Sequence, residues 1–181
     1  MSAYDDEVWR LVPSEPGPPP APLLRFVRSL PEVGKALDVG CGDGRLSREL
    51  PAERITGVDV SPLALERARQ RLPDAELVLV RPDERLPFPD STFELALCAE
   101  TVEHVRDVQL LLSELRRVLA PGGVLALTTP AHRPVLRTPD PLSPHIRFFT
   151  RRSLRRLLEE LGFEVVSLAR RSGTLLVRAT R

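Results

Sequence analysis

Apolar runs of strand length alternate with amphipathic segments along most of this chain. Runs of about four to eight apolar residues, bounded by turn residues, suit strands that are covered on both faces. They predict strands at residues 36–39, 55–59, 75–80, 93–99 and 124–129. The amphipathic segments predict helices at residues 23–30, 45–50, 62–72, 107–119 and 150–161. This alternation predicts an α/β fold built on a doubly wound, mostly parallel sheet.

Both ends of the chain add segments to this core. Apolar runs at residues 163–170 and 174–179, joined by Ser172 and Gly173, predict a closing antiparallel hairpin, which brings the sheet to about seven strands. At the amino end, residues 4–11 predict a short helix, and residues 13–22 are a proline-rich tether. We therefore divide the chain into residues 1–22 and a domain at residues 23–181.

One connection is longer than the others. Residues 130–149 are rich in proline and have neither helix nor strand periodicity. Connections of this length inside a compact domain are uncommon and usually functional. We expect this segment, together with residues 1–22, to build the binding site for a substrate.

A glycine-rich stretch follows the first predicted strand. Gly40, Gly42 and Gly44 can adopt positive φ without a Cβ penalty, so their amides can face a bound group near the start of the next helix. About 20 residues further on, Asp59 ends the second strand, where a carboxylate can accept hydrogen bonds from both hydroxyls of a ribose. The glycines alone are also compatible with a tight structural turn; the pairing with Asp59 favours a nucleotide-like ligand.

The spacing of these glycines separates two classes of ligand. A nicotinamide-binding fingerprint would place its third glycine where Arg45 stands, so Gly-x-Gly-x-Gly favours S-adenosylmethionine over a dinucleotide. The stretch resembles motif I of the class I S-adenosylmethionine-dependent methyltransferases, whose fold is Rossmann-like. The resemblance continues through residues 57–62, 86–90, 99–104 and 119–123.

The resemblance implies roles for particular residues. The stretch from Gly40 through Cys41 and Gly42 to Gly44 would hold the aminocarboxypropyl end of the cofactor, and Asp38 would orient its ammonium group. The other implied cofactor contacts are Asp59 to the ribose, Val60 to the adenine ring, Asp83 or Glu84 to the adenine amine, and Glu100. Pro82 stands where the family usually has an aspartate, which leaves the adenine contact open.

The amino-terminal segment is a candidate cofactor lid. In the resembled family such a segment often folds over the pocket, which would bring Tyr4 and Trp9 to it. The alternative is that Trp9 packs only on the domain surface.

Carboxylates and imidazoles gather near the fourth strand. Glu100, Glu103 and His104, with the later His145, provide donors suited to Mg²⁺ or Mn²⁺. This pattern resembles that of ubiquinone-pathway O-methyltransferases and of small-RNA 3′-end 2′-O-methyltransferases. Without an ion, Glu100 would contact the cofactor, and His104 or His145 would be the catalytic general base.

Composition narrows the partners and the compartment. The 181 residues carry a formal net charge of +1, so no overall basic field favours nucleic acid. The two cysteines, Cys41 and Cys98, lack metal-ligand spacing and read as reduced, apolar residues. No apolar run has the length of a membrane span, and the start of the chain is acidic, which predicts a cytoplasmic protein. The oligomeric state has no sequence signal.

The combined interpretation is an enzyme that moves a methyl group to an oxygen or nitrogen of a small molecule. An NAD-dependent oxidoreductase is the rival enzyme. A catalytically silent, cofactor-binding regulatory protein is a rival of another class, and methylation of an RNA 2′-oxygen is a lesser alternative.

Overall fold

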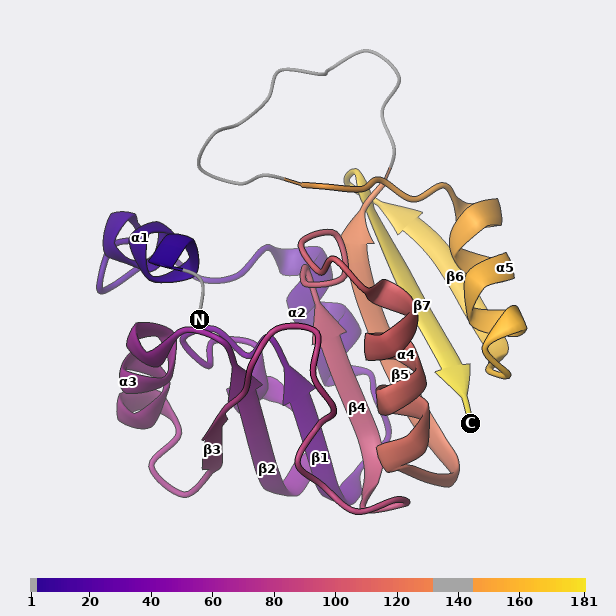
Figure 1. Cartoon of the computed structure of the whole chain (residues 1–181), viewed down its shortest axis with the longest axis horizontal. Coiled ribbons are helices and arrows are strands. Elements are labelled where there is room, and N and C mark those ends of the chain that lie inside the picture. Colours follow the sequence, from indigo (N-terminus) through magenta and orange to yellow (C-terminus); the bar gives the residue numbers. More distant parts are fainter. Residues whose placement is uncertain (1–2, 132–144) are drawn as a thin grey trace.

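The computed structural model describes residues 3–131 and 145–181, and within them the chain forms one seven-stranded sheet with helices on both faces (Figure 1). The strand order is β3-β2-β1-β4-β5-β7-β6. The strands are β1 Val33–Val39, β2 Ala52–Asp59, β3 Glu76–Leu79, β4 Phe93–Ala99, β5 Leu119–Pro130, β6 Glu164–Arg171 and β7 Thr174–Thr180. The helices are α1 Ala3–Leu11, α2 Ala21–Arg28, α3 Pro62–Arg71, α4 Val108–Val118 and α5 Arg151–Glu160.

The central strand β1 pairs in parallel with β2 and β4, and the parallel ladder extends to β3 and β5. Strand β7 is antiparallel to both β5 and β6, so the last two strands form the predicted hairpin. The predicted fold class is therefore confirmed. Because the parallel strands all point the same way, Val39, Asp59, Ala99 and Pro130 end at one edge of the sheet, which is the upper edge in Figure 1. We call this the carboxyl edge.

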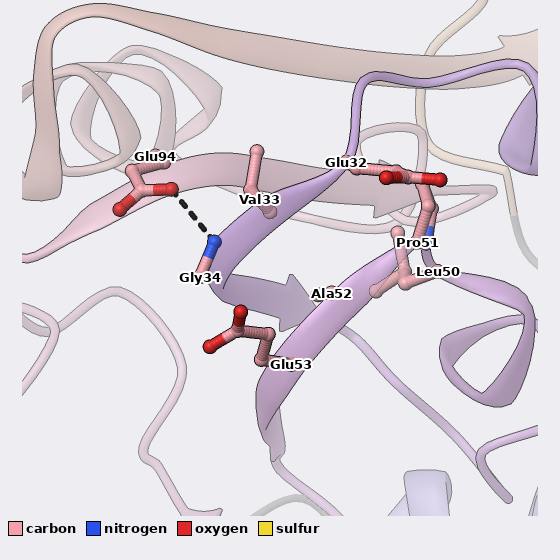
Figure 2. Close-up of a pocket in the computed structure, with 8 residues that line it drawn as sticks. All are labelled: Glu32, Val33, Gly34, Leu50, Pro51, Ala52, Glu53 and Glu94. Atoms are coloured by element: carbon pink, nitrogen blue, oxygen red, sulfur yellow. Dashed lines mark hydrogen bonds between the residues drawn. The ribbon is translucent and has the colours of Figure 1, made fainter.

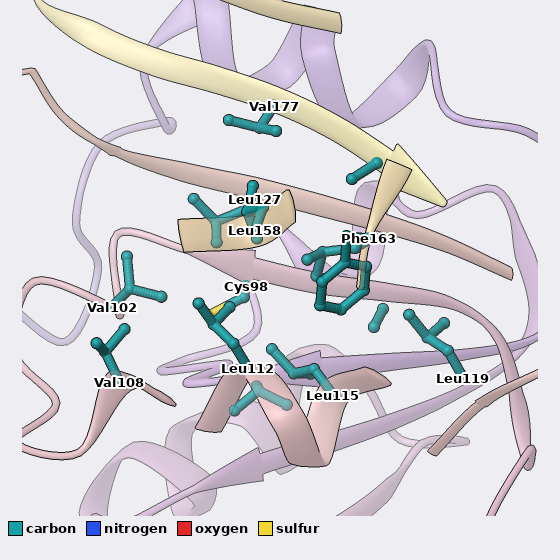
Figure 3. Close-up of a cluster of buried hydrophobic side chains, with 14 of the residues drawn as sticks. Cys98, Val102, Val108, Leu112, Leu115, Leu119, Leu127, Leu158, Phe163 and Val177 are labelled. Carbon is teal, nitrogen blue, oxygen red and sulfur yellow. The ribbon is translucent and has the colours of Figure 1, made fainter. Parts of the chain in front are cut away.

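Alternate side chains of the middle strands enter two separate cores. In β4, Ala96 and Cys98 pack with α4 and α5, whereas Leu95 and Leu97 pack with α2 on the other face. Figure 3 shows the first core, in which Leu112, Leu115 and Leu158 from the two helices meet the sheet. In the part of the chain that the structure describes, no helix combines the length and apolar content needed to cross a bilayer.

Several predicted boundaries were wrong. Helix α2 spans Ala21–Arg28 instead of residues 23–30, and β1 and β2 begin at Val33 and Ala52, three residues before the predicted starts. The helix expected at residues 45–50 is only a short 3-10 turn at Ser47–Glu49, because so short a segment before Pro51 cannot pay the cost of helix nucleation. Strand β5 begins at Leu119 instead of residue 124. At the start of β5 the Gly122 amide donates to the Arg181 carbonyl oxygen at 3.2 Å, which ties residues 119–123 to the end of the chain.

The loop from β3 to β4 is fastened to α4 by one guanidinium group. Arg117 donates to both carboxylate oxygens of Glu114, at 2.9 and 2.7 Å, and to the carbonyl oxygens of Leu86 and Phe88 at 3.0 and 2.8 Å. The Leu86 amide donates to the same Glu114 carboxylate at 3.0 Å. This bidentate pair fixes the loop that crosses from the edge of the sheet to its centre.

We expect Arg117→Ala to lower the free energy of unfolding by about 2 kcal/mol, since it removes the bidentate cation from Glu114 and the side-chain donor from two carbonyl groups. Urea unfolding measures the change. The control is Arg156→Ala, which removes an exposed i,i+4 pair with Glu160 and should leave the free energy of unfolding nearly unchanged. Equal losses in the two variants would contradict the prediction.

Candidate active site

The glycine bend, residues 40–44, forms where β1 ends at the carboxyl edge. Gly40, Gly42 and Gly44 have φ values of 73°, 56° and 80°, which L side chains rarely adopt. The amides of Gly40 and Cys41 both donate to the Val58 carbonyl oxygen, at 2.9 and 3.0 Å. The bend is therefore tied to the end of β2, the strand that carries Asp59.

Asp59 lies against this bend. Its Oδ2 accepts the Gly42 amide and its Oδ1 accepts the Ser61 amide, both at 2.9 Å. The carboxylate thus fixes the middle glycine and the start of α3, where the Ser61 hydroxyl accepts the Ala64 amide at 3.2 Å. The structure brings together the glycines and the acidic residue that the sequence paired.

Asp38 is buried directly before the bend, with 2% of its surface exposed. Its Oδ2 accepts the Ser47 hydroxyl at 2.6 Å. Burial raises the pKa of Asp38 from 3.8 to about 7, the Ser47 hydrogen bond opposes this rise, and the charge of Asp59 adds to it. A cationic group bound beside Asp38 would favour its ionised form.

The raised pKa of Asp38 predicts a pH dependence of stability. The folded chain holds a proton here that the unfolded chain releases near pH 3.8, so the stability present at low pH is lost as pH rises towards 7. Between about pH 5 and pH 8 we expect Asp38 to account for a loss of about 2 kcal/mol in the unliganded chain. Urea unfolding across this range should show a flatter profile for Asp38→Asn, whereas Glu53→Gln, an exposed carboxyl, should keep the original slope.

Glu100 lies at the end of β4 with a positive φ of 50°. The Thr128 hydroxyl donates to its Oε1 at 2.8 Å, and the Glu100 amide donates to the Thr128 carbonyl oxygen at 3.0 Å. Burial raises the pKa of the Glu100 carboxyl, and the Thr128 hydrogen bond opposes the rise. Glu100 is thus held towards β5 at the carboxyl edge.

Glu103 is buried with 1% of its surface exposed. Its Oε2 accepts the Thr129 hydroxyl at 3.0 Å, but its buried Oε1 accepts no hydrogen bond within the described residues. Burial first, and then the charge of Glu100, raise the pKa of Glu103 to about 8. A proton or a cation bound to this oxygen would supply the partner that it lacks within the described residues.

Two histidines face this oxygen. His104 Nε2 lies 4.0 Å from Glu103 Oε1, and the ring centroids of His104 and His145 are 5.0 Å apart. The Ile146 amide donates to the Glu103 carbonyl oxygen at 3.0 Å, which holds the segment with His145 beside the end of β4. One ligand atom from each of Glu103, His104 and His145 lies within 4.8 Å of the others. Of the four predicted ligands, the structure brings these three together, and Glu100 is not among them.

Asp83 and Glu84 are exposed in the loop after β3. Asp83 has a φ of 56°, and its carboxylate accepts the Asp107 amide at 3.0 Å, next to the start of α4. Val60, between Asp59 and Ser61, is half-buried at the carboxyl edge. Cys41 is buried, and its burial raises the pKa of the thiol well above its usual range, so it remains protonated.

Trp9 from the amino-terminal segment lies directly on the glycine bend. A Cβ placed on Gly42 would lie 2.8 and 2.9 Å from two carbons of the Trp9 ring. The Tyr4 side chain lies outside the described part of the structure. Residues 132–144, which make up most of the expected substrate segment, also lie outside it.

Hydroxyl groups around the site were missed by the sequence reasoning. Thr128 and Thr129 hold the two glutamates, and Ser47 holds Asp38. A run of polar residues at the end of an apolar strand was the available signal for the threonines. Nothing local marked Ser47, whose role depends on the turn that replaces the expected helix.

A separate hollow of about 540 Å³ lies at the opposite edge of the sheet. Figure 2 shows its lining, in which the Gly34 amide donates to Glu94 Oε2 at 2.8 Å. Val33, Ala52 and Glu94 stand at the starts of their strands, so this hollow is remote from the carboxyl edge. It lacks the glycine bend and Asp59, and we assign it no part in the chemistry.

Comparison with known proteins agrees with the geometry at the carboxyl edge. The model of a methyltransferase domain family matches residues 13–168. The chain is 33% identical over 137 residues to a trans-aconitate 2-methyltransferase of Paracidovorax citrulli, which covers 74% of this chain and 52% of that protein. It is 31% identical over 137 residues to a 2-methyl-6-phytyl-1,4-hydroquinone methyltransferase of a Synechocystis species, covering 73% and 41%.

The solved structures agree on the fold. A SAM-dependent methyltransferase from Aquifex aeolicus superposes with a TM-score of 0.73 at 20% identity, covering 99% of both chains. This chain spans about half, or less, of the two curated relatives named above. The matched family model covers most of the sequence, including the glycine bend, Asp59 and the end of β4. The chain belongs to the class I S-adenosylmethionine-dependent methyltransferase family.

Proposed function

We propose that this chain transfers a methyl group from S-adenosylmethionine to an oxygen or nitrogen of a small-molecule acceptor. The observation that carries the proposal is the direct bond between the Gly42 amide and Asp59 Oδ2, which creates one binding edge from two strands. The named relatives, which act on trans-aconitate and on a hydroquinone, support a small acceptor. The family match does not favour an NAD-dependent oxidoreductase.

Different residues at the carboxyl edge bind different parts of the cofactor. In this proposal Asp59 binds the ribose hydroxyls, Asp38 faces the ammonium group and the bend at residues 40–44 receives the aminocarboxypropyl end. Val60 borders the adenine ring, and Glu100 at the end of β4 completes the edge. Asp83 is tied to α4, so we assign the adenine amine to Glu84 or to backbone groups of this loop.

Bound S-adenosylmethionine supplies a methyl group already activated by the positive charge on its sulfur. The protein therefore has to align the acceptor lone pair with that carbon and to exclude water. As the acceptor bond to carbon forms, the carbon–sulfur bond breaks and its electron pair stays on sulfur. If no ion is bound there, His104 or His145, next to the carboxyl edge, takes the acceptor proton as the general base. Residues 130–149 and the amino-terminal segment build the acceptor site.

The test separates binding from turnover. Calorimetry with S-adenosylhomocysteine and with NAD should give binding of the first and none of the second; binding of NAD alone would reverse the proposal. Incubation with methyl-labelled S-adenosylmethionine and pools of small metabolites should then label a product. Binding without any labelled product, from metabolites or from RNA, would instead support a regulatory protein that holds the cofactor.

We further propose that Glu103, His104 and His145 hold a divalent ion. Glu103 Oε1 is buried and accepts no hydrogen bond within the described residues. One donor atom from each of the three residues lies within 4.8 Å of the other two, a spacing that fits a bound cation. One carboxylate with two imidazoles leaves room for water and for an acceptor oxygen, and favours Mn²⁺ over Mg²⁺. Such an ion would orient an acceptor hydroxyl and lower its pKa.

Manganese binding tests this site independently of activity. We expect Mn²⁺, followed by its electron spin resonance signal, to bind the intact chain, and Glu103→Gln or His145→Ala to weaken binding at least about 10-fold. Glu53→Gln, a carboxylate at the other edge of the sheet, is the control and should bind as the unchanged chain does. S-adenosylhomocysteine affinity should remain the same in all variants. The proposed ion site would be contradicted if Glu103→Gln bound Mn²⁺ as well as the unchanged chain does, or if the unchanged chain bound no Mn²⁺.

The cysteines bear on the compartment. Cys41 and Cys98 are both free and buried, and burial raises the pKa of each thiol. Protonated, unpaired thiols fit a reducing compartment. We therefore keep the cytoplasm as the proposed location.

A further inference from the structure

Three arginines fasten the amino-terminal strap, residues 9–17, to the site. Arg67 and Arg71 on α3 donate to the carbonyl oxygens of Val12 and Ser14, at 2.9 and 3.1 Å. Arg45, directly after the glycine bend, donates to the Gly17 carbonyl oxygen at 2.7 Å. Figure 1 shows the result, with α1 lying close to α3 near the carboxyl edge. The strap is thus held by charged donors to its backbone carbonyl groups.

One buried carboxylate organises two of these arginines. Asp43 has 3% of its surface exposed; its Oδ1 lies 3.0 Å from Arg45 Nε and its Oδ2 lies 3.2 Å from Arg71 Nη1. Arg71 also donates to the Asp43 carbonyl oxygen at 3.2 Å. Because Asp43 lies between Gly42 and Gly44, the fastening of the strap and the shape of the bend depend on the same residue.

The strap places the Trp9 ring against the glycine bend. The Trp9 ring covers Gly42 closely enough that a Cβ there would overlap it, and the Arg67 guanidinium carbon lies 5.8 Å from the ring centroid. The amide of the same glycine is bound to Asp59. The indole and the ribose-binding carboxylate therefore meet at Gly42.

We propose that Asp43 is a positioning residue that, through Arg45 and Arg71, holds the strap so that Trp9 forms a wall of the cofactor site. A wall assembled before the ligand arrives lowers the ordering cost of binding. The identity of the ligand rests on the proposed function above, whereas the position of Trp9 in the unliganded chain does not.

Trp9 is the sole tryptophan of the chain, so its fluorescence reports the strap alone. In the unchanged chain we expect limited quenching by acrylamide and an emission change on addition of S-adenosylhomocysteine. Asp43→Asn keeps the side-chain shape but removes the charge; it should expose Trp9 to acrylamide and weaken S-adenosylhomocysteine binding by about 10-fold, the effect of losing one charge-assisted bond. Arg71→Gln should act in the same direction, and Arg71→Lys should restore part of the shielding. The matched control is Arg69→Gln, an exposed arginine on the same helix.

The outcomes are distinct. If Asp43→Asn and Arg71→Gln match Arg69→Gln in both acrylamide quenching and affinity, or bind more tightly, the positioning role is overturned. If circular dichroism shows that Asp43→Asn does not fold, Arg71→Gln decides. If the unchanged chain binds no S-adenosylhomocysteine by calorimetry, the proposed function fails, while acrylamide quenching in the unliganded variants still decides whether Asp43 holds Trp9.

Discussion

Asp59→Ala should lower the affinity for S-adenosylhomocysteine by at least about 100-fold, measured by calorimetry. In the proposed binding mode two ribose hydroxyls donate to the Asp59 carboxylate and contribute about 1.5 kcal/mol or more each, which gives about 3 kcal/mol in total. The variant also releases the amides of Gly42 and Ser61, so the bend loses its link to β2. The loss should be seen in binding before any acceptor is added.

The control for this prediction lies on the same strand. Glu53 is an exposed carboxylate near the start of β2, whereas Asp59 ends the strand at the carboxyl edge. Glu53→Ala changes the net charge by the same amount and should leave the affinity within about 2-fold of the original, since it lies several strand residues away from the site. Equal weakening in the two variants would show that the effect comes from overall charge and that Asp59 does not bind the ribose.

The site was predictable where its parts follow local rules. The glycines at 40, 42 and 44 and Asp59 each sit where a predicted strand ends, and parallel strands bring such ends to one edge. The exposed pairs on α5, Arg155 with Glu159 and Arg156 with Glu160, likewise follow from i,i+4 spacing along one helix. Both features are encoded by spacing along short segments.

Contacts between distant segments were not predictable in this way. Arg67 and Arg71 look like solvent-facing residues of an amphipathic helix, and only the folded chain brings them to the carbonyls of the strap. The same holds for Glu103, whose unsatisfied oxygen results from burial against Thr129 and from the approach of His145. A pattern of residue types can identify candidate functional groups. Their burial and the positions of their hydrogen-bonding and charged partners in the folded chain then determine their chemical role.

Gly40→Ala should lower the free energy of unfolding by about 3 kcal/mol and also abolish the cofactor site. The φ of 73° costs an L side chain about 1 kcal/mol, and the new Cβ would overlap Thr101 Oγ1 and lie 2.7 Å from Thr101 Cγ2. Thr101 cannot easily move, because its hydroxyl donates to the carbonyl oxygens of Val39 and Ala99 at 3.3 and 3.0 Å. Overpacking of this kind adds about 2 kcal/mol.

Gly122→Ala separates the two contributions to this loss. Gly122 has nearly the same φ, 75°, but a Cβ there would meet nothing within 4 Å, so only the backbone cost of about 1 kcal/mol remains. Urea unfolding of both variants, with calorimetry of S-adenosylhomocysteine on each, measures the difference. A third variant, Gly40→Ala combined with Thr101→Ala, removes both obstructing atoms, Oγ1 and Cγ2, and should recover part of the stability. If the two glycine substitutions cost the same, the packing of Thr101 against the bend does not constrain Gly40, and backbone conformation alone explains the choice of glycine.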